Sequence, residues 1–105
     1  VDAASAVSGC GPAYAYMFME ALADGAVTCG LPRAKANTFA AQMLLGSAEL
    51  VLESGEHPGA LKDAVCSPGG TTIEGVCKLR ELGFDTTVQQ ALQAIIDKDF
   101  FLETN

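Results

Sequence analysis

A short polar loop in the last third of the sequence combines residue types that can bind an anion. It covers residues 67–72, SPGGTT in one-letter code, and leads directly into a predicted helix. Its proline fixes one backbone turn, and its two glycines permit positive φ or the close approach of a ligand. The first N–H groups of the helix, at Thr71, Thr72 and Ile73, have no partner within the helix and carry partial positive charge. With the hydroxyls of Ser67, Thr71 and Thr72, they suit a carboxylate or phosphate better than a metal.

Taken alone, the same pattern is also typical of an ordinary glycine-rich turn with a threonine N-cap. Other candidate side chains have simple structural interpretations as well. His57 precedes Pro58 in a turn, which favours a surface or N-capping role. Lys62 and Asp63 could form a local ion pair or frame a pocket, although a solvated helix face is the simpler interpretation. Cys66 adjoins the loop without a basic neighbour that would favour a reactive thiolate, so we expect it to be buried.

The sequence on both sides of this loop predicts helices, which must position it. Apolar periodicity, glycines and prolines predict five helices, over residues 12–29, 32–54, 59–65, 72–82 and from 85 onward. Pro12 and Pro32 suit the first position of a helix, Gly83 suits a helix C-terminus, and Asp85 suits an N-cap. A Glu74–Lys78 pair is expected on the fourth helix. The predicted fold class is all-α, in a single domain over residues 1–105.

The composition excludes several classes of protein. Half of the 105 residues are apolar and 18% are charged, which is too apolar for a disordered segment. Six Lys and Arg against thirteen Asp and Glu give a net charge of −7, which excludes a basic surface for nucleic acid or an anionic membrane. No apolar stretch approaches the ~20 residues of a membrane span. The four cysteines, Cys10, Cys29, Cys66 and Cys77, lack metal-type spacing.

We therefore expect a soluble, cytoplasmic protein with reduced thiols and no metal, disulfides being the less favoured alternative. Because the sequence begins Val1-Asp2-Ala3 without an initiator Met, we also expect it to be a piece of a longer polypeptide.

The first helix has apolar side chains around its whole circumference. These are Tyr14, Tyr16, Met17, Phe18, Leu22 and Val27. A helix of this kind must be buried on several faces, and a monomer of this length buries only about two-thirds of its unfolded surface. The pattern favours a homodimer over a compact monomeric bundle with an apolar centre.

The sequence around the loop resembles a known family. The run over residues 61–75, LKDAVCSPGGTTIEG, followed by Leu79 and Glu81, is similar to the signature of pyrroline-5-carboxylate reductase. Residues 8–14, 21–26, 30–34 and 57–59 are similar to the same family. The resemblance covers nearly the whole sequence in one register.

This resemblance implies a two-domain parent enzyme. Its members have an N-terminal Rossmann domain that binds NADPH or NADH and a C-terminal all-helical domain. The latter resembles the C-terminal domain of 6-phosphogluconate dehydrogenase and forms an interlocked homodimer, with a higher oligomer of dimers as a further option. This sequence resembles the helical half only, because it has no βαβ pattern and no dinucleotide fingerprint. We expect no cofactor in this chain and no activity from the chain alone.

The resemblance also implies the reaction, which is reduction of 1-pyrroline-5-carboxylate to L-proline, the last step of proline biosynthesis. The substrate-binding residues of the family fall on Ser67, Gly70, Thr71 and Thr72. Backbone N–H groups at the helix start would hold the carboxylate, and the Thr72 hydroxyl would hydrogen-bond the ring nitrogen, making Thr72 the candidate catalytic residue. Threonine is a poor general acid, so water or an already protonated iminium is the expected proton source.

Two positions depart from the family pattern. Cys10 stands where serine is more usual, and Gly55 stands where some members carry a glutamate near the substrate. Two alternative functions also remain, a homo-oligomerisation module without catalysis and a related reductase acting on another small imine or keto acid.

Overall fold

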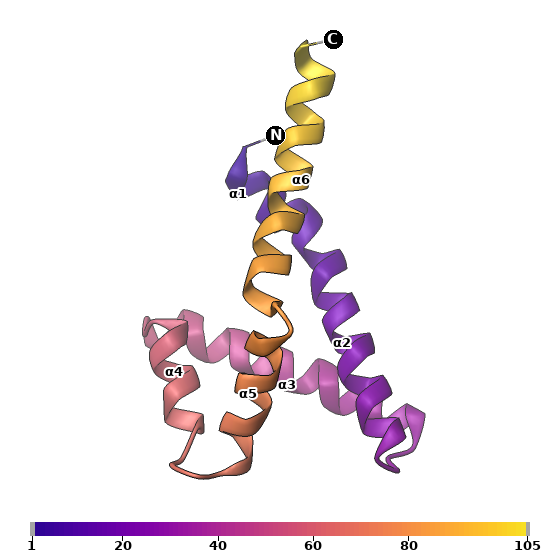
Figure 1. The fold of residues 1–105 in the computed structure, drawn as a ribbon, viewed down its shortest axis with the longest axis vertical. Coiled ribbons are helices and arrows are strands. Elements are labelled where there is room, and N and C mark those ends of the chain that lie inside the picture. The colour runs from indigo at the N-terminus through magenta and orange to yellow at the C-terminus, as the bar shows by residue number, and fades with distance from the viewer. Residues whose placement is uncertain (1, 105) are drawn as a thin grey trace. The chain divides into compact units, whose positions relative to one another are not determined.

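The computed structural model describes residues 2–104, and it describes side chains for residues 2–98. All regular structure in this part of the chain is helical (Figure 1), which confirms the predicted all-α class. The elements are α1 (Ala3–Ser5), η1 (Ala6–Cys10), α2 (Gly11–Thr28), α3 (Arg33–Ser54), α4 (Pro58–Val65), α5 (Thr71–Glu81) and α6 (Phe84–Thr104). The five helices α2 to α6 correspond to the five predicted ones.

The chain divides into two compact units. One unit, Ala13–Leu61, holds most of α2, all of α3 and the start of α4. The other unit combines Val1–Pro12 with Lys62–Asn105, and therefore holds α1, η1, the end of α4, α5 and α6. A single domain over residues 1–105 stays a prediction.

The first predicted boundary is wrong, because the chain is already helical before Pro12. The Asp2 carboxylate caps α1 by accepting a hydrogen bond from the Ser5 N–H at 2.7 Å, and this bond lowers the pKa of Asp2. In the π turn η1, the Gly11 N–H donates to the carbonyls of both Ala6 and Val7. A proline inside an α-helix leaves the carbonyl four residues earlier without a donor and clashes with it. The wider π turn directly before Pro12 eases that conflict, so the helix continues through the proline.

Helices α2 and α3 are joined by a glycine-terminated turn. Gly30 has φ +107°, its N–H donates to the Val27 carbonyl at 2.9 Å, and the Leu31 N–H donates to the Ala26 carbonyl at 3.0 Å. This pair of bonds is the Schellman motif, which ends helices at a left-handed glycine. Pro32 then serves as the N-cap of α3, one residue before its predicted role at the first helical position.

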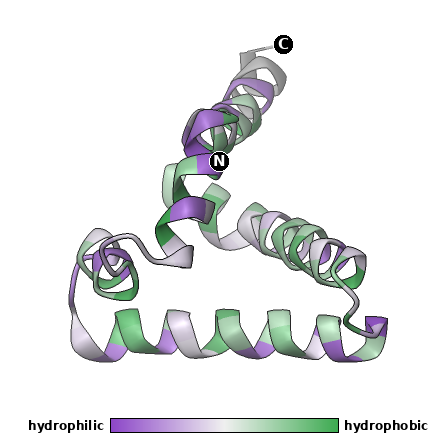
Figure 2. Cartoon of the chain, turned by 60° about the horizontal axis from the view of Figure 1, so that its bottom comes forward, coloured by the Kyte–Doolittle hydropathy of each residue, from purple (hydrophilic) through white to green (hydrophobic). Residues whose placement is uncertain are grey.

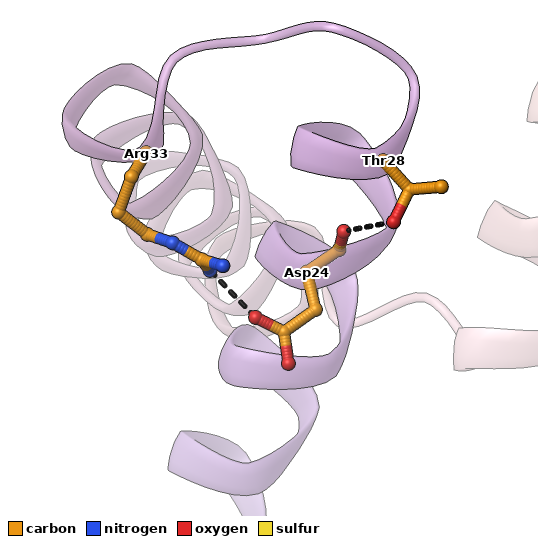
Figure 3. A network of polar contacts seen from close by, with 3 residues as sticks. All are labelled: Asp24, Thr28 and Arg33. Atoms are coloured by element: carbon orange, nitrogen blue, oxygen red, sulfur yellow. Dashed lines mark hydrogen bonds and ion pairs between the residues drawn. The ribbon is translucent and has the colours of Figure 1, made fainter.

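An ion pair links α2 to the start of α3 (Figure 3). The Arg33 guanidinium lies 2.6 Å from the Asp24 carboxylate, and both side chains are more than half exposed. The backbone carbonyl of Asp24 accepts a hydrogen bond from the Thr28 hydroxyl at 3.0 Å. A single exposed ion pair therefore joins α2 to the first turn of α3 at the surface.

The end of α3 and the start of α4 follow the sequence signals. Gly55 is left-handed, with φ +68°, and its N–H donates to the Val51 carbonyl. His57 Nδ1 accepts a hydrogen bond from the Gly59 N–H at 2.9 Å, directly before the first turn of α4. The capping role predicted for His57 is confirmed.

In the other unit, α6 contacts both α5 and η1. Gly83, with φ +88°, separates α5 from α6 as predicted. Helix α6 begins at Phe84, so Asp85 lies in its first turn instead of capping it, with a carboxylate oxygen 3.8 Å from Arg80 Nε. The Lys78 ammonium pairs with Glu81 at 3.0 Å and not with the predicted partner Glu74.

The buried residues of the chain are unusually small. Among residues 2–98 the buried apolar residues are all alanines, namely Ala6, Ala23, Ala36 and Ala40. Large apolar side chains are exposed instead, and Figure 2 shows hydrophobic segments recurring along α2 and α3. The exposed set in these two helices is Tyr16, Met17, Leu22, Phe39, Met43, Leu45, Leu50 and Leu52. A chain with this distribution has its large side chains available to a partner.

Candidate functional site

The loop before α5 is a tight turn with its conformation fixed by two residues. The Gly70 N–H donates to the Ser67 carbonyl at 3.0 Å, closing a four-residue turn. Pro68 occupies the second position of this turn and Gly69, with φ +69°, the third. Proline followed by a residue with positive φ is typical of a type II turn. The predicted roles of Pro68 and Gly69 are therefore confirmed.

The start of α5 presents backbone donors without a side-chain cap. Gly70 is the N-cap, so it supplies no side-chain oxygen, and α5 begins at Thr71, one residue earlier than predicted. Within the part of the chain that the structure describes, no side chain accepts from the N–H groups of Thr71, Thr72 or Ile73. Both threonines are exposed. These donors, at the positive end of the helix dipole, are available to an anion.

Ser67 lies over the N-cap of α5. A Cβ atom on residue 70 would overlap the Ser67 Oγ and would lie 3.3 Å from the Ser67 carbonyl oxygen. The Ser67 hydroxyl therefore occupies the space beside the bare Cα of Gly70. The structure thus brings together the two sequence-predicted residues Ser67 and Gly70, with Thr71 and Thr72 following at the helix start.

Three basic side chains of the same unit, Lys62, Lys78 and Arg80, are already paired with carboxylates. Lys62 lies 3.3 Å from Asp63, which confirms the local ion pair considered from the sequence. Lys78 and Arg80 on α5 face carboxylates at 3.0 and 3.8 Å. An anion at this loop would therefore depend on backbone N–H groups and hydroxyls more than on these cations.

The remaining candidates take structural positions. Cys66 is half-buried and its N–H donates to the Asp63 carbonyl at the end of α4, while Cys10 is half-buried in the π turn. All four cysteines are free thiols. Gly55 has a left-handed backbone conformation, which favours glycine over residues with a side chain. Among the described residues, no group of three or more His, Cys, Asp or Glu is arranged to hold a metal ion.

Sequence reasoning missed a pocket between α2 and α3. It is lined by Tyr16, Met19, Glu20, Asp24, Arg33, Asn37 and Ala41. Its lining includes the Asp24–Arg33 ion pair and also Tyr16, which the sequence indicated only as an apolar residue of the first helix. The one available signal was the pairing of opposite charges on either side of the Gly30-Leu31-Pro32 turn.

Comparison with known proteins decides the family. Residues 1–100 match the sequence family described as pyrroline-5-carboxylate reductase dimerisation. The chain belongs to this family. The resemblance drawn from residues 61–75 is therefore confirmed.

Individual relatives agree with the family match. The pyrroline-5-carboxylate reductase of Escherichia coli strain K12 is 61% identical over 92 residues, covering 88% of this chain and 34% of the relative. The enzyme of Synechocystis is 53% identical over 94 residues, covering 90% of this chain and 35% of the relative. The chain spans about a third of the length of these curated relatives.

Solved structures show the same fold. The 1-pyrroline-5-carboxylate reductase of Streptococcus pyogenes superposes with a TM-score of 0.88 at 45% identity, covering 91% of this chain and 37% of that chain. The pyrroline carboxylate reductase of Plasmodium falciparum, solved with NADP bound, superposes with a TM-score of 0.87 at 42% identity, covering 91% of this chain and 39% of that one. No described helix has the length and apolar character needed to cross a membrane.

Proposed function

We propose that this chain is the dimerisation and substrate-binding part of an oxidoreductase that reduces 1-pyrroline-5-carboxylate to L-proline. The observation that carries the proposal is the match over residues 1–100 together with relatives that are named for this reaction. Because the chain spans only about a third of those relatives, the activity belongs to the complete protein. We expect the 105-residue chain alone to show no turnover.

The partner that best fits the exposed apolar surface is a second copy of the chain. Several large side chains of α2 and α3, among them Met17, Phe39 and Leu45, are more than half exposed, while the buried residues of both helices are alanines. Helices of this kind gain stability when another apolar surface covers them. Membership of a dimerisation family supports a homodimer, interlocked through these helices, and dimers could assemble further.

The proposed substrate site is the turn before α5, with Ser67, Gly70, Thr71 and Thr72 as its binding residues. The backbone N–H groups at the start of α5 would bind the substrate carboxylate, which the helix dipole favours. The Thr72 hydroxyl would hydrogen-bond the ring nitrogen and orient the C=N bond. Thr72 is therefore the proposed catalytic residue.

In the reaction, hydride adds to the C=N carbon and the nitrogen gains or already carries a proton. Thr72 does not supply that proton, since its hydroxyl is too weak an acid, and water or a protonated iminium is the proposed source. The contribution of this chain is then to hold the imine in one orientation and to remove water from it.

The nicotinamide cofactor does not fit this chain by itself. The described residues are helical and contain no strand–loop–helix unit of the kind that holds a dinucleotide pyrophosphate. We propose that NADPH or NADH binds mainly outside this chain in the complete protein. A cytoplasmic location, where four free thiols persist, is part of the same proposal.

Turnover of the complete protein tests the proposed function. Oxidation of NADPH or NADH should depend on 1-pyrroline-5-carboxylate, and the 105-residue chain should give none. A complete protein that reduces another cyclic imine or a keto acid, and not this substrate, would identify a related reductase. A complete protein that forms dimers but reduces none of these compounds would identify an oligomerisation module.

A further inference from the structure

The two adjacent glycines of the loop have different reasons to be glycine. Gly69 has φ +69°, a conformation that side chains disfavour, so its backbone alone explains the residue. Gly70 has φ −81° and ψ 179°, an extended conformation that any residue adopts. The backbone does not require glycine at position 70.

Glycine at position 70 also lacks the side-chain hydrogen bond that other N-cap residues make. As the N-cap of α5 it would favour serine, threonine, aspartate or asparagine, whose side chains accept a hydrogen bond from the first turn of the helix. Glycine is itself an accepted N-cap residue, so capping does not decide the residue, and the space around its Cα gives a specific reason for glycine. A Cβ atom there would overlap the Ser67 Oγ, and apart from the adjacent residues of the chain the three atoms nearest to it all belong to Ser67.

The Ser67 hydroxyl lies in that space beside Gly70. Within residues 2–98 it has no hydrogen-bond partner, so its hydrogen and its lone pairs are available to a ligand at the start of α5. Ser67 is exposed and Gly70 is half-buried, so a ligand can reach the Ser67 residue from solvent.

We propose that Gly70 is a positioning residue, whose missing Cβ leaves the space that the Ser67 hydroxyl occupies beside the substrate-binding end of α5. The inference rests on the proposed function of the loop. It adds which residue places the Ser67 hydroxyl at the proposed binding site. Gly70 makes room for another side chain of the protein, whereas the glycine of an ordinary ligand cradle makes room for the ligand itself.

A double-mutant cycle in the complete reductase tests this inference. The variants are Gly70→Ala, Ser67→Ala and the two combined. Each single change should raise KM for 1-pyrroline-5-carboxylate about tenfold, because each removes the same hydroxyl from its binding position, with kcat changed less than about twofold. The combined variant should also raise KM only about tenfold, since the second change has nothing further to remove.

Gly75→Ala is the matched control. It adds the same single carbon atom to a glycine inside α5, where a Cβ meets nothing within 4 Å beyond the neighbouring backbone of the helix itself, and it should leave KM unchanged. The inference is overturned if the combined variant multiplies the two single effects to about hundredfold, or if either single variant keeps the wild-type KM.

Unfolding temperature separates this inference from the proposed function. If Gly70→Ala folds poorly, adding Ser67→Ala should restore folding because the overlapping atom is gone, and a failure to restore it overturns the inference. If the wild-type protein does not reduce 1-pyrroline-5-carboxylate, the proposed function is wrong. The inference then depends on the same comparison of unfolding temperatures, in which Gly70→Ala should be destabilising only when Ser67 is present.

Discussion

The α2 and α3 helices and the loop at residues 67–72 present opposite kinds of surface. In the helices, buried positions hold small residues such as Ala36 and Ala40, and large side chains such as Phe39 are exposed. In the loop, the exposed groups are hydroxyls and backbone N–H groups, on a turn that Pro68 and Gly69 fix. One surface offers apolar area and the other offers directed hydrogen bonds.

The difference explains how one small chain can support both assembly and binding. Apolar burial contributes roughly 25 cal/mol per Å² and has little directionality, so a partner helix gains affinity from total area. Hydrogen bonds contribute about 1 kcal/mol each and depend on geometry, so the loop gains selectivity from a fixed backbone. Changes in the helices should therefore affect assembly, and changes in the loop should affect turnover.

The largest effect is expected from Phe39→Asp on α3. Phe39 is 59% exposed, and a carboxylate in its place would have to be buried without a partner when a second copy covers the helix. We expect the dimer of the complete protein to weaken by about 2–4 kcal/mol, roughly 30- to 1,000-fold in Kd.

Sedimentation across a range of protein concentrations measures this change. Phe39→Leu keeps an apolar side chain and is the control, with a Kd close to the wild-type value. Dimers of wild-type strength in Phe39→Asp would mean that this part of α3 lies outside the interface.

The next effect is expected from Thr72→Ala in the loop. The change would remove the proposed hydrogen bond to the ring nitrogen of the substrate and leave the backbone donors of α5 in place. We expect kcat/KM of the complete protein to fall by about 1–3 kcal/mol, roughly tenfold to a hundredfold, without loss of the dimer. Thr71→Ala, at the neighbouring exposed threonine, should have a much smaller effect. Equal activity of Thr72→Ala and wild type would show that Thr72 does not contact the substrate in the reaction.

The same two regions also differ in how much the sequence could predict. Starts and ends of α3 and α5 were predicted within one residue, because Gly30, Pro32, Gly55 and Gly70 are local signals of turns and caps. The π turn before Pro12 was missed, since proline at the first helical position is the common arrangement. The alternative, a helix that widens to accept the proline, leaves no sequence pattern of its own.

In the loop, the turn could be predicted and the contact inside it could not. Pro68 and Gly69 specify the turn through their own backbone preferences. The overlap between the Ser67 hydroxyl and a side chain at position 70 depends on a rotamer and on distances across the turn. The Asp24–Arg33 pair was missed for a similar reason, because it forms across a turn and follows no helical period.

A smaller effect is expected from Arg33→Ala, which separates the ionic part of the α2–α3 region from its apolar part. The Arg33 and Asp24 side chains are 52% and 60% exposed, so water screens most of their attraction. We expect the change to cost less than about 1 kcal/mol of stability, and less in high salt. Thermal unfolding with and without 1 M NaCl measures it. A loss comparable with that of a buried contact, about 3 kcal/mol or more, would show that the pair organises the turn between the helices.

The smallest effect is expected at Asp2, the N-cap of the first helical turn. Its bond from the Ser5 N–H lowers the pKa of the carboxyl group in the folded chain, so the ionised form is the one that the fold stabilises. The capping contribution is therefore fully present above the ordinary aspartate pKa of 3.8 and is lost as pH falls through the lower pKa of the folded chain.

Hydrogen exchange of the Ser5 amide, followed by NMR against pH, should show protection that declines below pH 4, after correction for the intrinsic exchange rate. Asp2→Asn keeps an accepting oxygen and should remove the pH dependence while keeping protection, whereas Asp2→Ala should lose protection at every pH. Protection in Asp2→Ala equal to that of wild type would mean that the π turn, and not the cap, holds the start of this helix.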